Sequence, residues 1–400
     1  MSFQVGIEYL GFSTSKASID LEELAKHKHI DKNKYQQGLG QNEMSVITEQ
    51  EDIITLAYDA FYDAMNEKTT TINEIQNLKN EIEFLLFATE SAIDNSKSAG
   101  CELHHLLHLK SQCRCLEVKQ ACYGGTGALM IACDFIKANP TKKALVIMSD
   151  IAFYGLNTGG EATQGCGAIA MIISAKPKIA VFNNDNIYLT KNKNDFYRPI
   201  YSQQPIYDGH LSIKCYLEMF ASAYTEYKSQ NTNFDYLITH QPFTKMLYKC
   251  CKELDIDSDK NENEAITQYN KVIGNSYTAS LYIGLLSLLE NSKQNLADKK
   301  VLMFSYGSGA ECEIFSINII SGYGKYLHKN KHLNLLKNRK KLTYREYKKL
   351  LNHFKKRETK LNWQPTSSAI KHQEQYKIDN KLLLTKICNG IRYYTLADKV

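Results

Sequence analysis

Residues 116–139 read LEVKQACYGGTGALMIACDFIKAN, and this stretch decides the fold. Its first residues are typical of a strand, a turn follows at Cys122, and the apolar residues behind the glycines recur at helical spacing as far as Asn139-Pro140. We therefore expect a strand, a turn and a helix here, with Cys122 in the first turn of the helix. Short apolar runs alternate with longer amphipathic ones along the chain, which predicts a mixed α/β protein.

The same order of elements occurs twice. IEFLLFATE is a predicted buried strand that ends in Glu90, and Cys122 follows 32 residues later, before the predicted strands ALVIMSD and GCGAIAMIIS. FDYLITH is a predicted buried strand that ends in His240, and Asn275 opens an apolar helix 35 residues later, before the predicted strands VLMFSYGSG and CEIFSINII. This repetition predicts an internal duplication, with a ligand site between the two halves at the carboxyl ends of their strands.

We place the first half at residues 1–174, the second half at 175–320, and a basic, mainly helical extension at 321–400. Between residues 325 and 360 the extension has 14 Lys or Arg and only two Glu, whereas the whole chain carries a formal net charge of +6. Leu and aromatic residues interrupt this segment at helical spacing, which is typical of basic helices that pack on a core. We therefore expect no nucleic-acid partner, although a basic stretch is also what such a function would need.

The composition favours a folded globular protein. The 400 residues are 43% hydrophobic and 23% charged, with six Pro, so a large core can form and Pro-rich linkers are excluded. No apolar run approaches the ~20 residues of a membrane-spanning helix, and the first residues do not show a basic segment followed by an apolar signal core. We expect a cytoplasmic protein without a membrane partner, in which the 11 Cys are reduced.

The sequence gives little support for a cofactor. It has neither a G-x-G-x-x-G turn after a strand nor a phosphate-binding G-x-x-x-x-G-K-[ST] loop. One cluster combines metal-ligand residue types at helical spacing, namely Cys101, His104, His105 and His108. The Leu residues among them are typical of a helix that packs on a core, and no second cluster completes a ligand set. We therefore expect neither a metal ion nor an organic cofactor.

Three residues have the chemistry of acyl transfer. At the start of a helix, the helix dipole and backbone N–H groups would favour the thiolate of Cys122. At the end of an apolar strand, Glu90 would have a raised pKa and suit a base that removes a proton beside a carbonyl. His240 could bind a substrate oxygen near the thiol, and the glycine-rich turn FSYGSGA (304–310) could hold a developing oxyanion. Taken alone, each side chain could equally be structural.

At these residues the chain resembles the hydroxymethylglutaryl-CoA synthases of the thiolase superfamily, particularly the bacterial ones. The resemblance covers nearly the whole chain and rests on motifs in one order: GLGQNEMSV (38–46), ATESAID (88–94), EVKQACYGGTGAL (117–129), SDIAFYGLNTGGEATQGCGAIAMII (149–173), DGHLSIKCYLEMF (208–220), HQPFTKM (240–246), GNSYTASLYIGLLSLLE (274–290) and FSYGSG (304–309). It implies a duplicated thiolase-like α/β fold with αβαβα layers, usually a homodimer. It also implies an acyltransferase that condenses acetyl-CoA with acetoacetyl-CoA and water, without a metal ion or cofactor.

The resemblance also implies roles for individual residues. Acetyl-CoA would acetylate Cys122, Glu90 would take a proton from the acetyl methyl group, and His240 would position the acetoacetyl group. Two lysines four residues apart on one face of a predicted helix could bind phosphates or face solvent. Similarity assigns these lysines to CoA and five further residues to the substrate pocket: Lys245 and Lys249, and Tyr154, Thr163, Ser212, Asn275 and Ser308.

Two other functions stay open. A family member that takes an acetyl group from an acyl carrier protein, and condenses it with a polyketide β-keto thioester, would need the same Cys, Glu and His. Retention of both lysines and a long extension like that of the mevalonate-pathway members favour free CoA thioesters over a carrier protein. A protein that binds nucleic acid or another polyanion through its basic segment is a more distant alternative, because it would not need Cys122.

Overall fold

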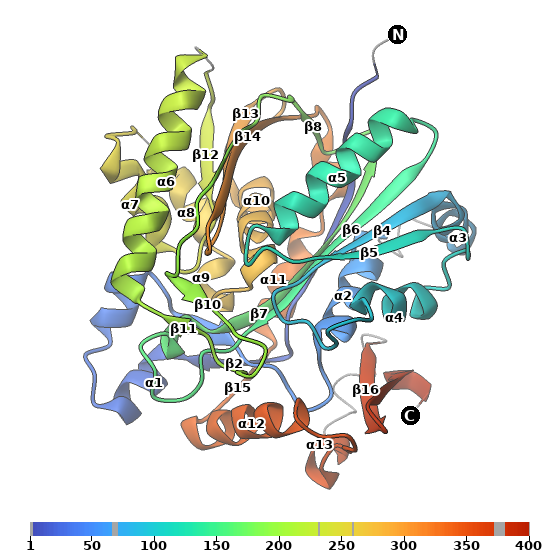
Figure 1. The fold of residues 1–400 in the computed structure, drawn as a ribbon, viewed down its shortest axis with the longest axis vertical. Helices are drawn as coiled ribbons and strands as arrows, with labels where there is room; N and C mark the ends of the chain where they lie inside the picture. Colours follow the sequence, from blue (N-terminus) through green and yellow to red (C-terminus); the bar gives the residue numbers. More distant parts are fainter. Residues whose placement is uncertain (1–2, 66–70, 231–232, 258–259, 372–380, 400) are drawn as a thin grey trace.

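A computed structural model describes residues 3–65, 71–230, 233–257, 260–371 and 381–399 (Figure 1). Its largest sheet has ten strands. They run in the order β12 (Tyr236–Thr239), β13 (Lys300–Gly307), β14 (Glu311–Ile319), β8 (Ala180–Phe182), β1 (Gly6–Ser13), β7 (Gly165–Ser174), β6 (Lys143–Ala152), β4 (Ile82–Ala88) and β5 (Arg114–Val118), while β9 (Ile187–Thr190) pairs with β14. The strands that the apolar runs predict are therefore all present.

The two halves of the sheet share one pattern of strand pairing. In the first half, β4 pairs in parallel with β6, and β6 pairs antiparallel with β7. In the second half, β12 pairs in parallel with β13, and β13 pairs antiparallel with β14. The strand before Glu90 thus corresponds to the strand before His240, as the repeated pattern predicts. The boundary between residues 174 and 175 stays a prediction.

Helices lie on both sides of the sheet halves and between them (Figure 1). On β6, Leu145 and Ile147 pack in one cluster with α2 (Ile53–Ala64) and α4 (Ala99–Leu106). The alternate residues Val146 and Met148 face α5 (Gly124–Ala138) and α10 (Ser280–Asn291) instead. On β13, Phe304 contacts aromatic rings of α6 (Gly209–Ser229), which covers the second half together with α7 (Lys245–Glu253). The inner helices α5 and α10 therefore start at the junction of the halves.

Close contacts hold these two helix starts together. All side chains of α10 from Ser280 to Glu290 are buried, as expected for a helix that is apolar on every side. A Cβ at Gly125 would lie 2.6 Å from the carbonyl oxygen of Thr278, so only glycine allows this approach. The hydroxyl of Thr126 lies 2.7 Å from that of Tyr282 on α10. The Cys122 turn and the Asn275 loop are thereby placed side by side.

The extension packs against both halves and is only partly helical. It contains α11 (Lys329–Lys337), α12 (Tyr344–Arg357) and α13 (Ser367–Lys371), together with β15 (Lys340–Lys341), β16 (Leu382–Cys388) and β17 (Ile391–Leu396). The sequence analysis did not predict the β16–β17 hairpin. Its turn is Asn389-Gly390, with positive φ at both residues, and Asn-Gly is the usual signal for such a hairpin.

The remaining α-helices and strands are short or peripheral. They are α1 (Leu21–Lys28), α3 (Ile72–Glu81), α8 (Lys260–Thr267), α9 (Asn270–Ile273), β2 (Ala17–Asp20), β3 (Glu43–Ser45), β10 (Phe196–Tyr197) and β11 (Ile206–Tyr207). Strand β2 pairs with β3 and with β15, which ties the extension to the N-terminal segment. Among the helices that the structure describes, none has the length and apolarity needed to cross a membrane.

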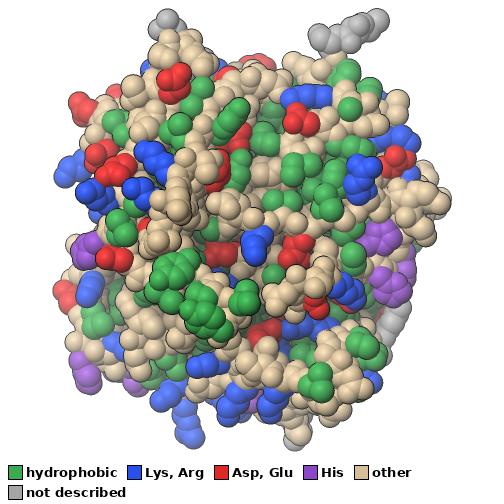
Figure 2. Space-filling view, viewed as in Figure 1, with side chains coloured by type: hydrophobic (Ala, Val, Ile, Leu, Met, Phe, Trp, Pro, Cys, Tyr) green, Lys and Arg blue, Asp and Glu red, His purple; other side chains and the backbone are tan. Residues whose placement is uncertain are grey.

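The basic segment of the extension is partly structural. On α12, Tyr347 and Leu351 are buried, and the buried guanidinium of Arg357 donates to the carbonyl oxygens of Glu49 and Glu51 at 2.8 Å. Other Lys and Arg side chains gather along the lower edge in Figure 2, where Figure 1 places α12. This arrangement matches the prediction of basic helices that pack on a core.

Candidate active site

Cys122 and Glu90 are in direct contact. Glu90 lies just beyond the end of β4, and Cys122 lies in the turn between β5 and α5. The Sγ of Cys122 donates to Oε2 of Glu90 at 3.4 Å. The residue before the thiol, Ala121, has a φ of 44°, a left-handed conformation that is strained for a residue with a Cβ. Because α5 begins at Gly124, Cys122 precedes the helix rather than lying in its first turn.

The carboxyl group of Glu90 is tuned to exchange a proton near neutral pH. Burial raises the pKa of Glu90 to about 7. The guanidinium of Arg198 opposes this rise in pKa, with Nη2 at 3.1 Å from Oε1 of Glu90, whereas the carboxylate of Asp150 adds to it. Arg198 also donates from Nη1 to the backbone oxygen of Glu90 at 2.7 Å, which fixes the position of the residue. The raised pKa expected from the sequence is present.

The surroundings of Cys122 favour the thiol over the thiolate. Burial raises its pKa well above the usual value, and the negative charges of Glu90 and Asp150 raise it further. The expectation of a helix-stabilised thiolate is therefore wrong. The sequence indicates that Cys122 lies near the start of a helix. It does not indicate that two carboxylates lie beside the sulfur. The structure instead provides a thiol whose proton already points to an acceptor, Glu90.

The carboxylate of Asp150 lies beside Glu90 and accepts hydrogen bonds from both halves. Its Oδ1 accepts hydrogen bonds from the backbone N–H of Glu90 at 2.7 Å and from the hydroxyls of Thr89 and Ser91 at 2.9 Å. Its Oδ2 accepts from the backbone N–H of Thr278 at 3.1 Å and from the hydroxyl of the same residue. The sequence analysis missed Asp150, although it lies in the run ALVIMSD near the end of a buried strand, the pattern that identified Glu90.

An aromatic group packs against Cys122. Tyr154 and Tyr277 are buried, and Phe196 and Tyr207 pack on them together with Cys122. Phe196 and Tyr207 belong to β10 and β11, which flank Arg198. The ring centroids of Tyr154 and Tyr207 are 5.5 Å apart with an edge-to-face geometry. The irregular segment before α6 thus supplies both an apolar wall and the cation beside Glu90, and the sequence analysis identified neither.

Three residues assigned by similarity lie together on this side of the site. The amide nitrogen of the Asn275 side chain donates to the hydroxyl oxygen of Tyr154 at 3.4 Å. The backbone N–H of Asn275 donates to the carbonyl oxygen of Thr163 at 3.1 Å. Asn275 is itself held by the backbone N–H of Tyr277, which donates to Oδ1 at 2.9 Å. The side chains are oriented by their neighbours.

His240 lies at the corresponding strand end of the second half. It follows β12, and its backbone N–H donates to the carbonyl oxygen of Phe304 at 2.8 Å. The hydroxyl of Tyr216 donates to the backbone oxygen of His240 at 2.6 Å. Burial lowers the pKa of His240 to about 3, so the ring is neutral at pH 7. Its ring nitrogens have no hydrogen-bond partner in the described part of the chain, which leaves them available to a ligand.

Asp195 organises the region around Ser212. Ser212 donates from its hydroxyl to the backbone oxygen of Asp195 at 3.0 Å, and Tyr306 donates to Oδ2 of Asp195 at 3.0 Å. The backbone N–H of Gly309 donates to Oδ1 at 3.1 Å. Because this N–H already donates to Asp195, it cannot donate to a developing oxyanion. The sequence analysis had proposed that role for the turn 304–310. Asp195 was also missed, because nothing in its local sequence distinguishes it.

The end of β13 nevertheless lies against the Cys122 turn. A Cβ at Gly307 would lie 2.6 Å from the carbonyl oxygen of Gln120 and from the backbone nitrogen of Tyr123. These residues flank Cys122 on either side. Ser308 follows directly and is half-buried. The glycine therefore permits the second half to approach the Cys122 turn closely.

The two predicted CoA-binding lysines lie on α7, which begins five residues after His240. Lys245 is exposed, with its Nζ 5.1 Å from the ring centroid of Tyr248, and Lys249 is half-buried. Neither forms an ion pair with any residue that the structure describes. No contact joins either lysine to Cys122 or Glu90, so the structure does not bring them into the catalytic group.

The side chains of the cluster around Cys101, His104, His105 and His108 do not point toward one common position, as metal ligands would. His104 lies on α4 and has its Nε2 3.1 Å from the carbonyl oxygen of Lys110. His105 and His108 have ring centroids 6.4 Å apart, and Cys101 is exposed. Within the described ranges, a different set of residues meets the geometry for metal ligands.

Comparisons with known proteins agree with the fold and the site. The family models for the N-terminal and C-terminal parts of hydroxymethylglutaryl-coenzyme A synthase match residues 2–178, and residues 186–268 and 255–380. The hydroxymethylglutaryl-CoA synthase of Enterococcus faecalis is 38% identical over 354 residues, which cover 86% of this chain and 90% of that protein. A polyketide biosynthesis 3-hydroxy-3-methylglutaryl-ACP synthase of Bacillus subtilis is 31% identical, over 78% of this chain and 79% of that protein.

A solved structure extends the agreement to three dimensions. The crystal structure of an HMG-CoA synthase complexed with CoA superimposes with a TM-score of 0.89 at 33% identity, and covers 98% of this chain and 100% of that one. The family models and the solved structure cover nearly the whole molecule, and the two relatives cover 86% and 78% of it. The resemblance inferred from the motifs and the mixed α/β, thiolase-like fold are thereby confirmed. The chain belongs to the hydroxymethylglutaryl-CoA synthase family of acyl-condensing enzymes.

Proposed function

We propose that the protein condenses acetyl-CoA with acetoacetyl-CoA and water to give hydroxymethylglutaryl-CoA and free CoA. The observation that carries this proposal is the contact between the Cys122 thiol and the Glu90 carboxylate at 3.4 Å. Burial gives that carboxyl a pKa of about 7, so it can take up and release a proton at neutral pH. A nucleophile and a base in contact are what a two-stage acyl transfer requires.

In the first stage, Cys122 is acetylated. The thiol proton passes to Glu90 as the sulfur attacks the thioester carbon of acetyl-CoA. The carbon–sulfur bond to CoA then breaks, and the CoA thiolate takes the proton from Glu90 and leaves as the thiol. Glu90 is thereby returned to its ionised form, beside an acetyl group on Sγ.

In the second stage, Glu90 removes a proton from the acetyl methyl group. The resulting enolate carbon bonds to the ketone carbon of acetoacetyl-CoA, and the ketone oxygen becomes an alkoxide that takes up the proton held by Glu90, which returns Glu90 to its ionised form. Because His240 is neutral at pH 7, it can donate a hydrogen bond to this oxygen without carrying charge. Water then cleaves the Cys122 thioester, which releases the product carboxylic acid and restores the thiol.

Two observations support CoA thioesters as the substrates. The E. faecalis relative, which is 38% identical, is a hydroxymethylglutaryl-CoA synthase, whereas the B. subtilis relative that acts on a carrier protein is 31% identical. Lys245 and Lys249 lie one helical turn apart on α7 and have no carboxylate partner among the described residues. Two unneutralised ammonium groups on one face suit the phosphates of CoA. We assign Tyr154, Thr163, Ser212, Asn275 and Ser308 to the pocket for the acyl groups.

We also propose that the protein forms a homodimer. Strand β5 lies at the edge of the ten-stranded sheet, and its apolar residue Leu116 is 47% exposed. An unpaired edge with exposed apolar side chains is a natural surface for self-association. Analytical ultracentrifugation of the full chain tests this, and a monomer at micromolar concentration would contradict it. The cytoplasmic location stays a prediction.

Separate measurement of the two stages tests the catalytic roles. Cys122→Ala should abolish protein acetylation by acetyl-CoA, and full labelling of this variant would remove Cys122 from the mechanism. Glu90→Ala should still be acetylated, although more slowly, because water must then accept the thiol proton while loss of the carboxylate lowers the raised pKa of the thiol. It should fail to condense, because the methyl proton then has no acceptor. If condensation survived as well as acetylation in a folded variant, Glu90 would not be the base.

A further inference from the structure

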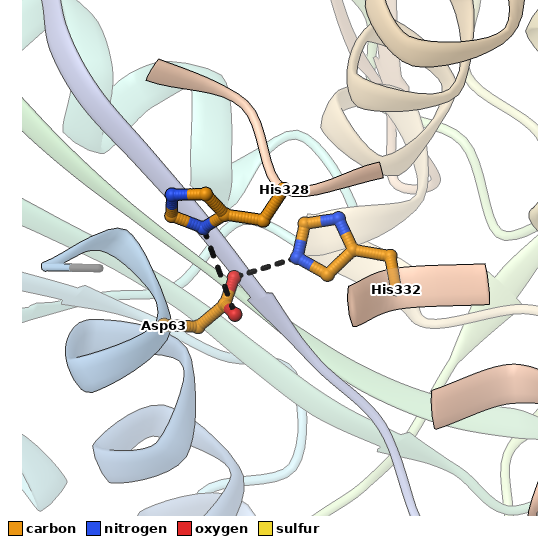
Figure 3. Close-up of side chains that lie close together, drawn as sticks. All are labelled: Asp63, His328 and His332. Atoms are coloured by element: carbon orange, nitrogen blue, oxygen red, sulfur yellow. Dashed lines mark hydrogen bonds and ion pairs between the residues drawn. The ribbon is translucent and has the colours of Figure 1, made fainter. Parts of the chain in front are cut away.

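A second cluster of titratable side chains lies where the extension meets both halves. Asp63 comes from α2, Glu290 from α10, His328 from the residue before α11, and His332 from α11 itself. All four residues are at most 9% exposed. One ligand atom from each of Asp63, His328 and His332 lies within 4.8 Å of the other two (Figure 3). The proposed condensation uses none of them.

Hydrogen bonds fix the ring of His332. Its Nδ1 lies 2.9 Å from Oε1 of Glu290, and its Nε2 lies 2.7 Å from Oδ2 of Asp63. A histidine whose one ring nitrogen is held by a carboxylate, while the other faces a further ligand, is the usual arrangement around a protein-bound metal ion. Glu290 is in turn oriented by the backbone N–H of His328, which donates to Oε1 at 3.0 Å.

His328 gives an independent indication of a ligand. Its ring points toward Asp63 in Figure 3, but its Nδ1 lies 3.9 Å from Oδ1 of Asp63, too far for a hydrogen bond. This buried nitrogen has no hydrogen-bond partner in the described part of the chain. A buried polar atom without a partner is costly and calls for an explanation. A cation between His328, His332 and Asp63 would bond to it.

The charges of the cluster also suit a divalent cation. Asp63 and Glu290 place two carboxylates in the interior, where they face His332 and the ammonium group of Lys331, 2.8 Å from Oδ1 of Asp63. The backbone N–H of Phe12 donates to Oδ2 of Asp63 at 2.9 Å. The side chain of Lys331 is 61% exposed and can turn to solvent. A divalent ion would then replace the positive charges that Lys331 and a protonated His332 give to the two carboxylates.

We infer that Asp63, His328 and His332 form a structural site for a divalent transition-metal ion, with Zn²⁺ as the ion that best suits two imidazoles and a carboxylate. The ion bonds to Nδ1 of His328, Nε2 of His332 and a carboxylate oxygen of Asp63. The proton shared between His332 and Asp63 goes to water, and Glu290 holds the other nitrogen of His332. The ion fastens the extension to α2 and takes no part in the condensation.

Zinc titration of the full chain tests this site. The protein is freed of metal with a chelator, dialysed, and titrated with Zn²⁺ in a calorimeter, with thermal unfolding followed in parallel. We expect one equivalent to bind and to raise the unfolding temperature. His328→Ala should weaken binding at least tenfold and abolish the thermal shift. This variant should fold, because the ring of His328 makes no hydrogen bond in the described chain.

A matched variant and a spectroscopic probe locate the ion. His353 is also in the extension and also faces a carboxylate, with Nδ1 3.0 Å from Oε1 of Glu49, so His353→Ala should bind Zn²⁺ as the unaltered protein does. Bound Co²⁺ should show no thiolate-to-metal charge-transfer band. No binding, equal binding by His328→Ala, or a thiolate band that places the ion on cysteine would each overturn the proposal.

Discussion

Replacement of Arg198 should shift the pH dependence of condensation. Burial raises the pKa of Glu90 to about 7, and the guanidinium of Arg198, 3.1 Å from Oε1, holds it from rising further. An opposite charge at this range typically lowers a carboxyl pKa by about 1–3 units, so Arg198→Met should raise the pKa of Glu90 by a similar amount. The base is ionised only above its pKa, and activity should therefore be lost at neutral pH and return as the pH rises.

The size of the effect follows from the ionised fraction. With a pKa of about 7, roughly half of Glu90 is ionised at pH 7. A rise of one unit leaves roughly a tenth ionised, and a rise of two units leaves roughly a hundredth. The rate of condensation at pH 7 should therefore fall about fivefold for a rise of one unit, about fiftyfold for two and about 500-fold for three. The loss should become smaller above the new pKa.

The assay is single-turnover condensation from the acetylated protein, measured between about pH 5 and pH 9, which is about two units on either side of the Glu90 pKa of about 7. Arg198→Lys keeps the positive charge, so the pH at which half of the activity is lost on the acidic side (the acid limb of the profile) should return toward 7. Lys214→Met removes one exposed charge from α6 and should leave the profile unchanged. An acid limb that stays near pH 7 in Arg198→Met, or a loss that is equal at every pH, would refute the electrostatic role of Arg198.

Two further substitutions and one titration test the geometry. Gly307→Ala should slow acetylation by up to about 100-fold, because its Cβ would lie 2.6 Å from atoms that flank Cys122, whereas Gly209→Ala, with open space around it, should not. The ring of His240 should show no protonation between pH 5 and 8 in NMR titrations, because burial lowers its pKa to about 3; a midpoint near 6.5 would contradict a buried, neutral ring. Leu286→Ala in the buried face of α10 should cost about 2–5 kcal/mol in the free energy of unfolding, and a loss below 1 kcal/mol in denaturant titrations would show that the core is loosely packed there.

Local patterns in the sequence predict the sheet and the catalytic group. The buried strands correspond to short apolar runs in the sequence. The polar residues Glu90 and His240 mark the carboxyl ends of two of them, β4 and β12. The glycines around Cys122 predict a tight turn before a helix. These features depend on residues close together in the chain, and parallel strands bring their ends to one edge of a sheet. The pairing of Cys122 with Glu90 follows from that rule.

Other features depend on contacts between distant residues and leave no local pattern. Arg198 reaches Glu90 across 108 residues from a segment without periodicity, so its role needs the folded chain. The raised pKa of the Cys122 thiol depends on two carboxylates from different strand ends. Asp63 and His332 meet across 269 residues, whereas His328 and His332 have the i, i+4 spacing of metal ligands on a helix, a signal that the sequence analysis did not use. The β16–β17 hairpin is different, because its Asn389-Gly390 signal was present in the sequence.

The most direct test of the proposed function compares the two classes of acyl donor. The purified protein is incubated with acetyl-CoA and acetoacetyl-CoA, together and separately, while product and intact protein mass are followed. The contact between Cys122 and Glu90 predicts transient acetylation at Cys122 by acetyl-CoA and formation of hydroxymethylglutaryl-CoA when both substrates are present. Absence of acetylation and product with CoA substrates, followed by acetylation of Cys122 from an acetylated carrier protein, would contradict the proposal.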